Sequence, residues 1–325
     1  MTDLDTQKFT VVSTMKNEGP YILDWVAHYK ALGFDHIVVC TNDCDDETDA
    51  MLEFLQSQGL VRHHRTRIWP RAGIHRSALK QARRYTETTQ ADWIFVCDVD
   101  EYLNIHIGDG SVRSLVAASG DKTDIISVPW RLFGPNNIQD VRDIPVTEQF
   151  TDAEPDYSVN PRAGKFVKSI FTGHDNFKRI GIHGPIPHPD LGRELKHVLP
   201  GGAAYVENGE RTENPAAFDV AQVNHYALRS VDSFLIKRDR GRANHMSHTI
   251  GEKYWRRHNL GGVQDDSISQ YDGAAGDWRD RLQEWPELMA LHDKAVAWHL
   301  EKAAALRKSE DQQPLIEFVM RSFGT

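Results

Sequence analysis

The first hundred residues alternate between short apolar runs and stretches in which apolar residues recur at helical spacing. The apolar runs have the length and the β-branched content of buried strands. The segments 20–33 and 74–88 between them each have the pattern of an amphipathic helix. This order predicts a parallel sheet with helices on both faces. The expected strands span 9–14, 36–41, 61–68 and 93–97.

The pattern becomes less regular in the second half of the chain. The polar stretch 146–164 contains two prolines and predicts a flexible loop. From residue 233 onward the sequence is charged and mainly helical in pattern. Further strands are expected at 125–130, 166–171, 179–183 and 221–226.

Polar loops follow three of the predicted strands, at 16–19, 42–46 and 98–101. In parallel sheets flanked by helices, ligands bind at the carboxyl ends of the strands. We therefore expect the three loops to converge on one crevice, and this convergence is the main sequence evidence for a functional site.

Asp98 and Asp100 follow the apolar run 93–97. On a regular strand both side chains would face the same side. Two close carboxylates repel each other, and a bound Mg²⁺ or Mn²⁺ would remove that penalty. Such ions are typically held by one or two carboxylates together with the phosphates of a substrate. The motif therefore predicts a divalent metal site, and the simpler alternative is a solvated strand end or a helix cap.

A second chemistry also places two aspartates after an apolar strand. In haloacid-dehalogenase-like phosphatases the first aspartate is a nucleophile, and the motif normally lies on the first strand. Here the motif follows the fourth predicted strand and continues into Glu101. A phosphatase remains the alternative function.

Composition narrows the class of protein without identifying it. The chain has 325 residues, of which 40% are hydrophobic and 26% are charged, as is typical of a soluble globular protein. Its net charge of -9 is opposite in sign to that of most nucleic-acid-binding proteins. We therefore expect no nucleic-acid partner.

Three cysteines, an odd and low number, predict a reducing compartment and no disulfide framework. Cys40 and Cys44 lack the second cysteine pair of a zinc site. No apolar run approaches the ~20 residues of a membrane span, and the N-terminus lacks the pattern of a signal peptide. We expect a cytoplasmic protein with no integral membrane segment, whose membrane contact, if any, is peripheral.

Known glycosyltransferases resemble this chain most in two stretches, KNEGPYILDWVAHYKALGFDHIVVCTNDCDDETDAMLEFLQSQG (16–59) and ADWIFVCDVDEYL (91–103). The chain resembles family 2-type glycosyltransferases of the GT-A fold, above all the branch with a D-x-D-E motif that is related to glycosyltransferase family 92. The likeness covers most of the chain in order, through KSIF (168–171), IHGP (182–185), VNHYALRSVDSFLIKRDRGRAN (223–244), YWRRHN (254–259) and QDDSI (264–268).

The resemblance implies an α/β fold of the GT-A type, with a Rossmann-like, mostly parallel sheet between helices and a helical C-terminal extension. Residues 1–140 would bind the nucleotide-sugar, 141–232 would form the acceptor-side half of the same domain, and 233–325 the helical region. The implied activity is metal-dependent, inverting transfer of a sugar from a nucleotide-diphosphate donor, preferably a UDP-sugar, to a glycan or lipid-linked acceptor. A non-catalytic module that binds nucleotide or glycan is the third possibility.

The resemblance also implies roles for individual residues. Asp98 and Asp100 would bind Mn²⁺ or Mg²⁺, with His183 or His225 as a further ligand, although either histidine could instead be a turn or core residue. The nucleotide would contact Asn17, Glu18, Asn42 and Asp43, and the diphosphate would contact Arg76, Lys168, Lys237, Arg238 and Arg242.

An inverting transfer needs a carboxylate that takes the proton of the acceptor hydroxyl. Asp190 and Glu101 are the two candidates, and Glu101 could instead orient the metal motif. Asp265 and Asp266 could close over the site from the helical region.

Other residues have simpler explanations. Arg240 and Arg257 are expected to be solvated surface charges. Trp130, Tyr226 and Trp255 could stack on a sugar, but aromatic side chains lie in a core more often.

Overall fold

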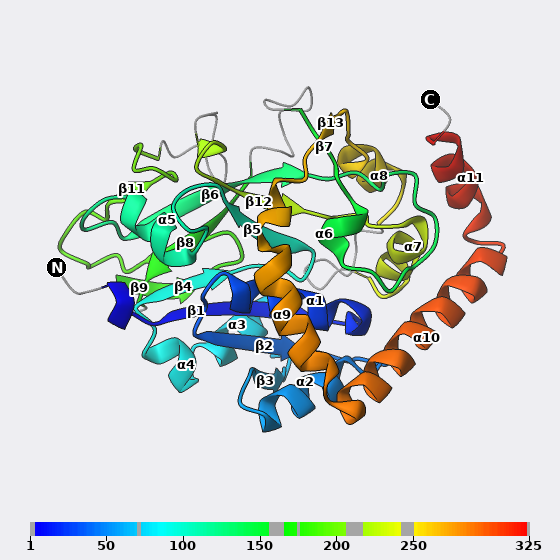
Figure 1. The fold of residues 1–325 in the computed structure, drawn as a ribbon, viewed down its shortest axis with the longest axis horizontal. Helices are drawn as coiled ribbons and strands as arrows, with labels where there is room; N and C mark the ends of the chain where they lie inside the picture. The colour runs from blue at the N-terminus through cyan, green and yellow to red at the C-terminus, as the bar shows by residue number, and fades with distance from the viewer. Residues whose placement is uncertain are drawn as a thin grey trace.

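The computed structural model describes residues 4–69, 73–155, 166–173, 176–205, 217–241 and 250–323. It contains a nine-stranded sheet with the strand order β3-β2-β1-β4-β8-β6-β12-β5, and β11 pairs with β6. The four strands predicted from the first hundred residues form the parallel half of this sheet (Figure 1). They are β1 (Phe9–Met15), β2 (His36–Thr41), β3 (Arg62–Arg65) and β4 (Trp93–Val96).

The other half of the sheet mixes strand directions. β8 lies antiparallel to both β4 and β6, and β12 lies parallel to β6 and antiparallel to β5. Because two reversals separate β4 from β6, the strands β4, β6 and β12 point the same way and end at the same edge. The strands of this half of the sheet are β5 (Glu101–Ile105), β6 (Ile125–Leu132), β8 (Val167–Thr172), β11 (His197–Val198) and β12 (Ala221–His225).

Alternate residues of β1 face opposite sides of the sheet, as the strand period requires. Phe9 belongs to the core shared with α1 and α2, whereas Val12 belongs to the core shared with α3. Helix α9 packs against α1 and crosses the front of the sheet in Figure 1. Helices therefore cover both faces, and the predicted GT-A architecture is confirmed. They are α1 (Ile22–Ala31), α2 (Thr48–Ser57), α3 (Ile74–Ala82) and α9 (Asp272–Gln283).

The C-terminal region is mainly helical, as predicted. Its helices bury Phe234 and Trp255 in a core of their own. The long helix α10 runs along the lower right edge of Figure 1 and packs against α2 and α7. The largest core draws residues from all three proposed parts, so the division at residues 140 and 232 stays a prediction. The helices are α7 (Val231–Asp239), α8 (Glu252–His258), α10 (Pro286–Lys308) and α11 (Gln313–Arg321).

One predicted helix is interrupted. The pattern predicted a single helix over 74–88, but α3 is followed by the separate α4 (Thr86–Thr89). Tyr85 between them has an extended backbone, with φ -79° and ψ 145°, and its hydroxyl lies 2.6 Å from Nδ1 of His64. A tertiary contact thus replaces the helical continuation that the local pattern favours.

Two predicted strands have other limits. The third is shorter than 61–68, and the strand predicted at 179–183 is β9 (Phe177–Ile180). It turns into the antiparallel β10 (Pro185–Pro187), with the Gly181 N–H donating to the Gly184 carbonyl at 2.9 Å. The hairpin turn begins where the apolar pattern would have continued the strand.

The polar stretch 146–164 begins with α6 (Val146–Gln149) and β7 (Asp152–Ala153), and its last residues lie outside the described ranges. β7 pairs with β13 (Val263–Gln264). In the described part of the chain, no helix combines the length and apolar character needed to cross a membrane. The other short elements are η1 (Leu4–Thr6), η2 (Gly19–Tyr21), α5 (Val112–Ala118) and η5 (Ser267–Tyr271).

Candidate active site

A cavity of about 330 Å³ lies at the carboxyl ends of β1, β2 and β4. Each of the three polar loops contributes to it, as the sequence predicted. Glu18 comes from the first loop, Asn42 from the second, and Asp98 and Asp100 from the third. The opposite wall comes from later elements, and its charged and aromatic members include Trp130, His183, His225, Lys237, Arg240, Tyr254, Arg257 and His258.

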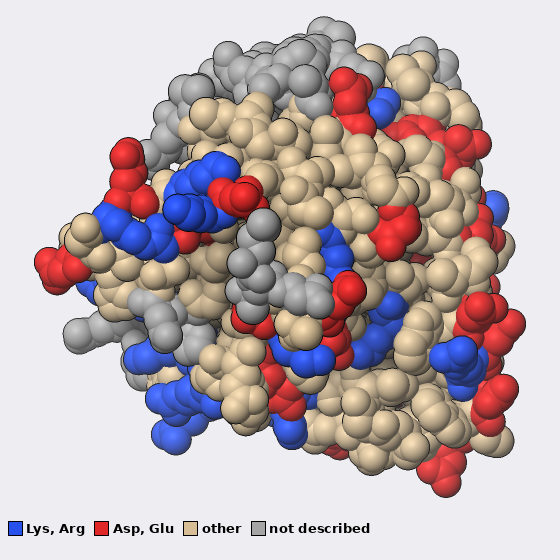
Figure 2. Space-filling view, turned by 60° about the vertical axis from the view of Figure 1, so that its left-hand side comes forward, with Lys and Arg blue, Asp and Glu red and all other residues tan. Residues whose placement is uncertain are grey.

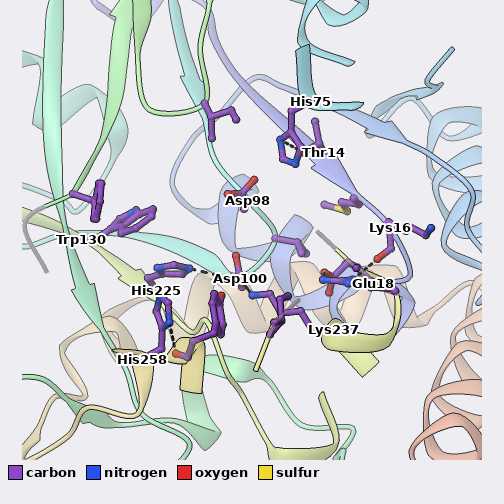
Figure 3. Close-up of a pocket in the computed structure, with 18 of the residues that line it drawn as sticks. Thr14, Lys16, Glu18, His75, Asp98, Asp100, Trp130, His225, Lys237 and His258 are labelled. Atoms are coloured by element: carbon purple, nitrogen blue, oxygen red, sulfur yellow. Dashed lines mark hydrogen bonds and ion pairs between the residues drawn. The ribbon is translucent and has the colours of Figure 1, made fainter. Parts of the chain in front are cut away.

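Asp98 and Asp100 lie in a tight turn and not on a strand. β4 ends at Val96, and the Glu101 N–H donates to the Asp98 carbonyl at 3.1 Å as β5 begins. The chain turns here because β5 leaves β4 and pairs with β12. The prediction that the two aspartates share a strand face is therefore wrong, but both line the cavity, as Figure 3 shows.

A buried lysine holds Asp98. Nζ of Lys168 lies 3.2 Å from Oδ2 of Asp98 and 3.0 Å from Oε2 of Glu101. Burial raises the pKa of Asp98, but the Lys168 ammonium, the nearby His75 and the hydrogen bond from Lys168 together hold it below its ordinary value. Burial lowers the pKa of Lys168, and the two carboxylates reverse that effect and raise it above its ordinary value. Lys168 therefore stays charged between Asp98 and Glu101.

Asp100 has a different lysine partner. Nζ of Lys237, from α7, lies 2.6 Å from Oδ2 of Asp100 and donates to the Ala227 carbonyl at 2.8 Å. Nε2 of His225 lies 3.7 Å from the same carboxylate oxygen. Burial raises the pKa of Asp100, but Lys237 and His225 hold it well below its ordinary value. Asp100 is therefore an anion at neutral pH.

Glu101 faces away from the cavity. It is fully buried, and its Oε2 accepts the Asp98 N–H at 2.8 Å. Burial raises the pKa of Glu101 to about 8, although Lys168 opposes the shift. This placement supports the role of orienting the acidic turn and gives no support to Glu101 as the catalytic base.

The first loop is held in a constrained conformation. Asn17 has a φ of 50°, and its Oδ1 accepts the Asp45 N–H at 2.8 Å, which links the first two loops. The Glu18 carboxylate lies 2.8 Å from Nη1 of Arg229 and forms a second ion pair with Arg240. Glu18 lines the cavity, whereas Asn17 is not part of its lining.

The residues predicted beside the nucleotide are only partly brought together. Asn42 is buried and lines the cavity, whereas Asp43 is exposed and is not part of the lining. Arg76 is exposed on α3, and its neighbour His75 lines the cavity instead, with Nδ1 3.2 Å from Oγ1 of Thr14. Burial lowers the pKa of His75. The resemblance named Arg76, and its contact with the diphosphate stays a prediction.

Both predicted histidine ligands line the cavity, but they differ in their contacts. Nδ1 of His183 lies 3.0 Å from the Val167 carbonyl oxygen, whereas His225 faces Asp100 (Figure 3). The Trp130 ring lies against both, with centroid distances of 4.3 Å to His225 and 5.3 Å to His183. Of the two histidines, His225 is the one adjacent to the acidic turn.

The residues of the C-terminal region that were predicted to contact phosphate also differ in whether they line the cavity. Lys237 faces the cavity, whereas Arg238 donates to the Ile250 carbonyl at 3.1 Å and is not part of the lining. Arg242 lies outside the described residues. Helical spacing explains the difference, because consecutive helix residues point in different directions.

Several cavity residues were missed or misassigned. Arg240 was expected to be solvated, but it is paired with Glu18 and lines the cavity, so that expectation is wrong. Arg257 is exposed, as expected, and also lines the cavity. Tyr254 and His258 lie in the stretch 254–259 that resembles glycosyltransferases. The resemblance therefore pointed to this stretch but did not assign a role to either residue. The other two aromatic candidates, Tyr226 and Trp255, are core residues.

The carboxylates proposed outside the acidic turn do not reach the cavity. Asp190 and Asp266 are exposed and are not part of its lining. Asp265 accepts a hydrogen bond from Gln222 at 2.9 Å and pairs with Arg131 at 3.2 Å. The carboxylates of the described residues that line the cavity are Glu18, Asp98 and Asp100.

The donor set around Asp100 fits a hard divalent cation. Asp100, Glu101 and His225 can each bring a ligand atom within 4.8 Å of the others. Carboxylate oxygens suit Mg²⁺ and Mn²⁺, and an imidazole nitrogen suits Mn²⁺. Nδ1 of His225 is buried without a hydrogen-bond partner among the described residues. Of these three, Asp100 and His225 line the cavity, whereas Glu101 is turned toward Lys168; Asp98 is the other carboxylate of the turn that lines the cavity.

Acidic and basic side chains are interspersed over the molecular face in Figure 2. Among the described residues on this face, the basic side chains do not form an extended surface of their own. The basic side chains at the cavity are a local feature that suits a small anionic ligand.

Together, the sheet and the cavity define an α/β protein of the GT-A type with an acidic turn and basic side chains around the cavity at the carboxyl ends of its strands. The family model of glycosyltransferase family 92 matches residues 11–226, well over half of the chain. The chain belongs to glycosyltransferase family 92. The relationship to this family that the sequence indicated is thereby confirmed.

A curated relative supports this assignment. A glycosyltransferase family 92 protein of Arabidopsis thaliana is 24% identical over 243 residues. The match covers 70% of this chain and 36% of that relative, so the chain spans only about a third of the relative's length.

The similar solved structures are distant. TarS 1–349 of S. aureus is 13% identical with a TM-score of 0.36, and its complex with UDP is 16% identical with the same TM-score. Each comparison covers 93% of this chain and 92% of the TarS chain. HddC of Yersinia pseudotuberculosis is 12% identical with a TM-score of 0.31, covering 61% of this chain and 92% of HddC. Likenesses this distant do not bear on what this chain binds.

Proposed function

We propose that this protein is an inverting, cation-dependent glycosyltransferase that moves a sugar from a UDP-sugar to a hydroxyl of a glycan or lipid-linked acceptor. The observation that carries the proposal is the meeting of an acidic pair, a buried amide and several basic side chains in one cavity of a family 92 chain. These groups are Asp98, Asp100, Asn42, Lys237, Arg240 and Arg257.

The strand-end side of the cavity suits the nucleotide. The Asn42 side chain can both donate and accept hydrogen bonds, which a base or ribose requires. From the opposite wall, Lys237 and Arg240 pair with Asp100 and Glu18, so a diphosphate beside the acidic turn would lie within their reach. A divalent cation bound by Asp98 and Asp100 would supply positive charge for the departing nucleoside diphosphate.

The opposite side suits a sugar acceptor. Trp130, Phe166 and Tyr254 contribute aromatic surface to the lining. An aromatic face suits the apolar face of a sugar ring, and polysaccharide biosynthesis is the corresponding role.

Melting shifts with UDP-, GDP- and TDP-sugars, each with and without Mn²⁺, test this proposal. UDP-sugars with Mn²⁺ should give the largest shift, and the wild-type protein should release UDP from one of them. Asp100→Ala should remove the Mn²⁺-dependent part of the shift and lower turnover by about a hundredfold or more, the scale of a lost electrostatic contact to developing charge. Asp293→Ala, on the exposed face of α10, is the matched control and should change neither.

The alternatives give different outcomes in the same experiment. Phosphate release from generic esters would indicate a phosphatase, which the family assignment disfavours. Binding of Mn²⁺ and UDP with no consumption of any donor would indicate a binding module. An Asp100→Ala variant that keeps the full Mn²⁺-dependent shift would show that the cation site is elsewhere.

A further inference from the structure

Each aspartate of the acidic turn contacts one lysine, but the two lysines differ in accessibility. Lys168 has an exposed side-chain fraction of 0% and lies between Asp98 and Glu101. Lys237 has an exposed side-chain fraction of 20% and lines the cavity. Lys168 is therefore a fixed part of the protein interior, whereas Lys237 borders the space that a ligand would fill.

Lys237 contacts one carboxylate oxygen of Asp100, a proposed ligand of the cation. Its Nζ lies 2.6 Å from Oδ2 of Asp100, and Nε2 of His225 approaches the same oxygen to 3.7 Å. A Mg²⁺ ion on that oxygen would lie only ~2.0–2.1 Å away from it. Two positive charges on one carboxylate oxygen repel each other strongly in a partly buried site. The ammonium and the cation therefore compete for Asp100.

The remaining contacts of Lys237 are compatible with its release. Its second hydrogen bond goes to a backbone carbonyl, that of Ala227, at 2.8 Å. The Tyr254 ring centroid lies 5.5 Å from Nζ, on the cavity wall. A lysine stem is flexible, and its ammonium can redirect its three donors to new acceptors. The oxygens of a diphosphate in the cavity would be such acceptors.

We propose that Lys237 is a tethered counter-cation, which neutralises Asp100 in the donor-free protein and transfers to the diphosphate when cation and nucleotide bind together. Lys237 is thus a positioning residue that makes cation binding depend on the nucleotide. The free protein does not hold the cation tightly, and the donor and the cation enter the site as one unit. This inference rests on the proposed function.

Calorimetric titration of the whole chain with Mn²⁺, alone and with saturating UDP, tests the inference without measuring turnover. In the wild-type protein, UDP should tighten Mn²⁺ binding at least tenfold. Lys237→Met keeps the apolar stem and removes the charge. We expect this variant to bind Mn²⁺ alone at least tenfold more tightly than the wild type does, and to gain less from UDP.

Two further variants make the result interpretable. Lys253→Met, on the exposed face of α8 and outside the cavity lining, should behave as the wild type does. Lys237→Arg keeps the charge and should retain weak binding of Mn²⁺ alone, so a folded Lys237→Arg protein provides the comparison even if Lys237→Met does not fold. Tight binding of Mn²⁺ alone by Lys237→Arg would overturn the inference.

The outcomes separate this inference from the proposed function. If the wild type binds Mn²⁺ together with UDP but Lys237→Met gains no affinity for Mn²⁺ alone, the role of Lys237 is wrong and the proposed function stands. If the wild type binds no Mn²⁺ with or without UDP, both are wrong.

Discussion

The cavity has two walls of different origin. The strand-end wall consists of Glu18, Asn42, Asp98 and Asp100, which lie on loops within the family-matched residues 11–226. The helical wall consists of Lys237, Arg240, Tyr254, Arg257 and His258, which all follow that span. The helical wall nevertheless supplies the cations that pair with Asp100 and Glu18. The strand-end wall thus holds the acidic groups, and distant residues set their charge balance.

The largest effect is expected from replacing Arg229, which pairs with Glu18 of the strand-end wall. This buried residue lies 2.8 Å from Glu18, and it donates to the Val99 carbonyl at 3.0 Å. Arg229→Met removes one of the two arginines that pair with the buried Glu18 carboxylate. We therefore expect the free energy of unfolding to fall by about 3–5 kcal/mol. Chemical denaturation followed by circular dichroism gives this value.

An exposed ion pair provides the matched control. Lys302 and Asp239 join α10 to α7 at 2.6 Å, with exposed side-chain fractions of 35% and 37%. Lys302→Met should cost less than about 1 kcal/mol, because solvent screens such a pair. An equal loss of stability in Arg229→Met and Lys302→Met would show that the buried ion pair contributes no more to stability than the exposed one.

The next largest effect concerns pH and the packing of α1 against the C-terminal region. His28 lies in α1, its ring centroid is 5.3 Å from that of Tyr271, and its Nε2 is 2.9 Å from the Leu103 carbonyl oxygen. Burial lowers the pKa of His28 to about 4 from an ordinary value of 6.5. In the unfolded chain His28 therefore becomes protonated below pH 6.5, whereas in the folded protein it becomes protonated only near pH 4.

The stability contribution of a neutral His28 is present above pH 6.5 and is lost as the pH falls toward 4. The loss amounts to about 3 kcal/mol, since one pKa unit corresponds to about 1.4 kcal/mol. His28→Gln should flatten the dependence of unfolding free energy on pH in this interval by that amount. An unchanged slope in the variant would mean that His28 has the same pKa in the folded and the unfolded protein.

A smaller effect is expected at the join between α10 and the first loop. Nε2 of His299 lies 2.7 Å from Asp46, which also accepts the Gly19 N–H at 2.9 Å beside Glu18. Burial raises the pKa of Asp46, but the bond from His299 and its other hydrogen bonds hold it below its ordinary value. His299→Ala should cost about 1–3 kcal/mol, because it removes one hydrogen-bond partner of a buried carboxylate. It should also raise the donor KM several-fold with little change in kcat.

His292→Ala distinguishes positioning from general damage to α10. His292 is a buried histidine of the same helix. Its Nε2 lies 2.9 Å from Oδ1 of Asp143, which is not part of the first loop. Its replacement should lower stability without changing the donor KM. If both variants raised KM equally, α10 would affect the site only through overall stability.

The strand-end wall was largely predictable because its residues follow apolar strands at the rim of a parallel sheet. The limits of this reasoning are visible at the acidic turn. Local pattern placed Asp98 and Asp100 on a strand, but the pairing of β5 with β12 bends the chain there. Similarly, His75 replaces Arg76 in the cavity because the facing of α3 depends on what it packs against.

The helical wall was less predictable because its residues reach the cavity through long-range packing. Arg240 has the local sequence of a solvated helix end, and only the fold brings it to Glu18. The resemblance did identify Lys237 but also selected Arg238, which points elsewhere. Local sequence gives the residue types, whereas tertiary contacts decide which of them face the ligand.

The central claim is that Asp98 and Asp100 hold a divalent cation that grips a nucleoside diphosphate. Anomalous diffraction from a crystal soaked with MnCl₂ and UDP tests it directly. The account predicts a manganese peak bounded by Asp98, Asp100 and His225, with the diphosphate beside it and Lys237 turned from Asp100 to a phosphate oxygen. Manganese and UDP bound elsewhere, with the acidic turn unoccupied, would contradict it.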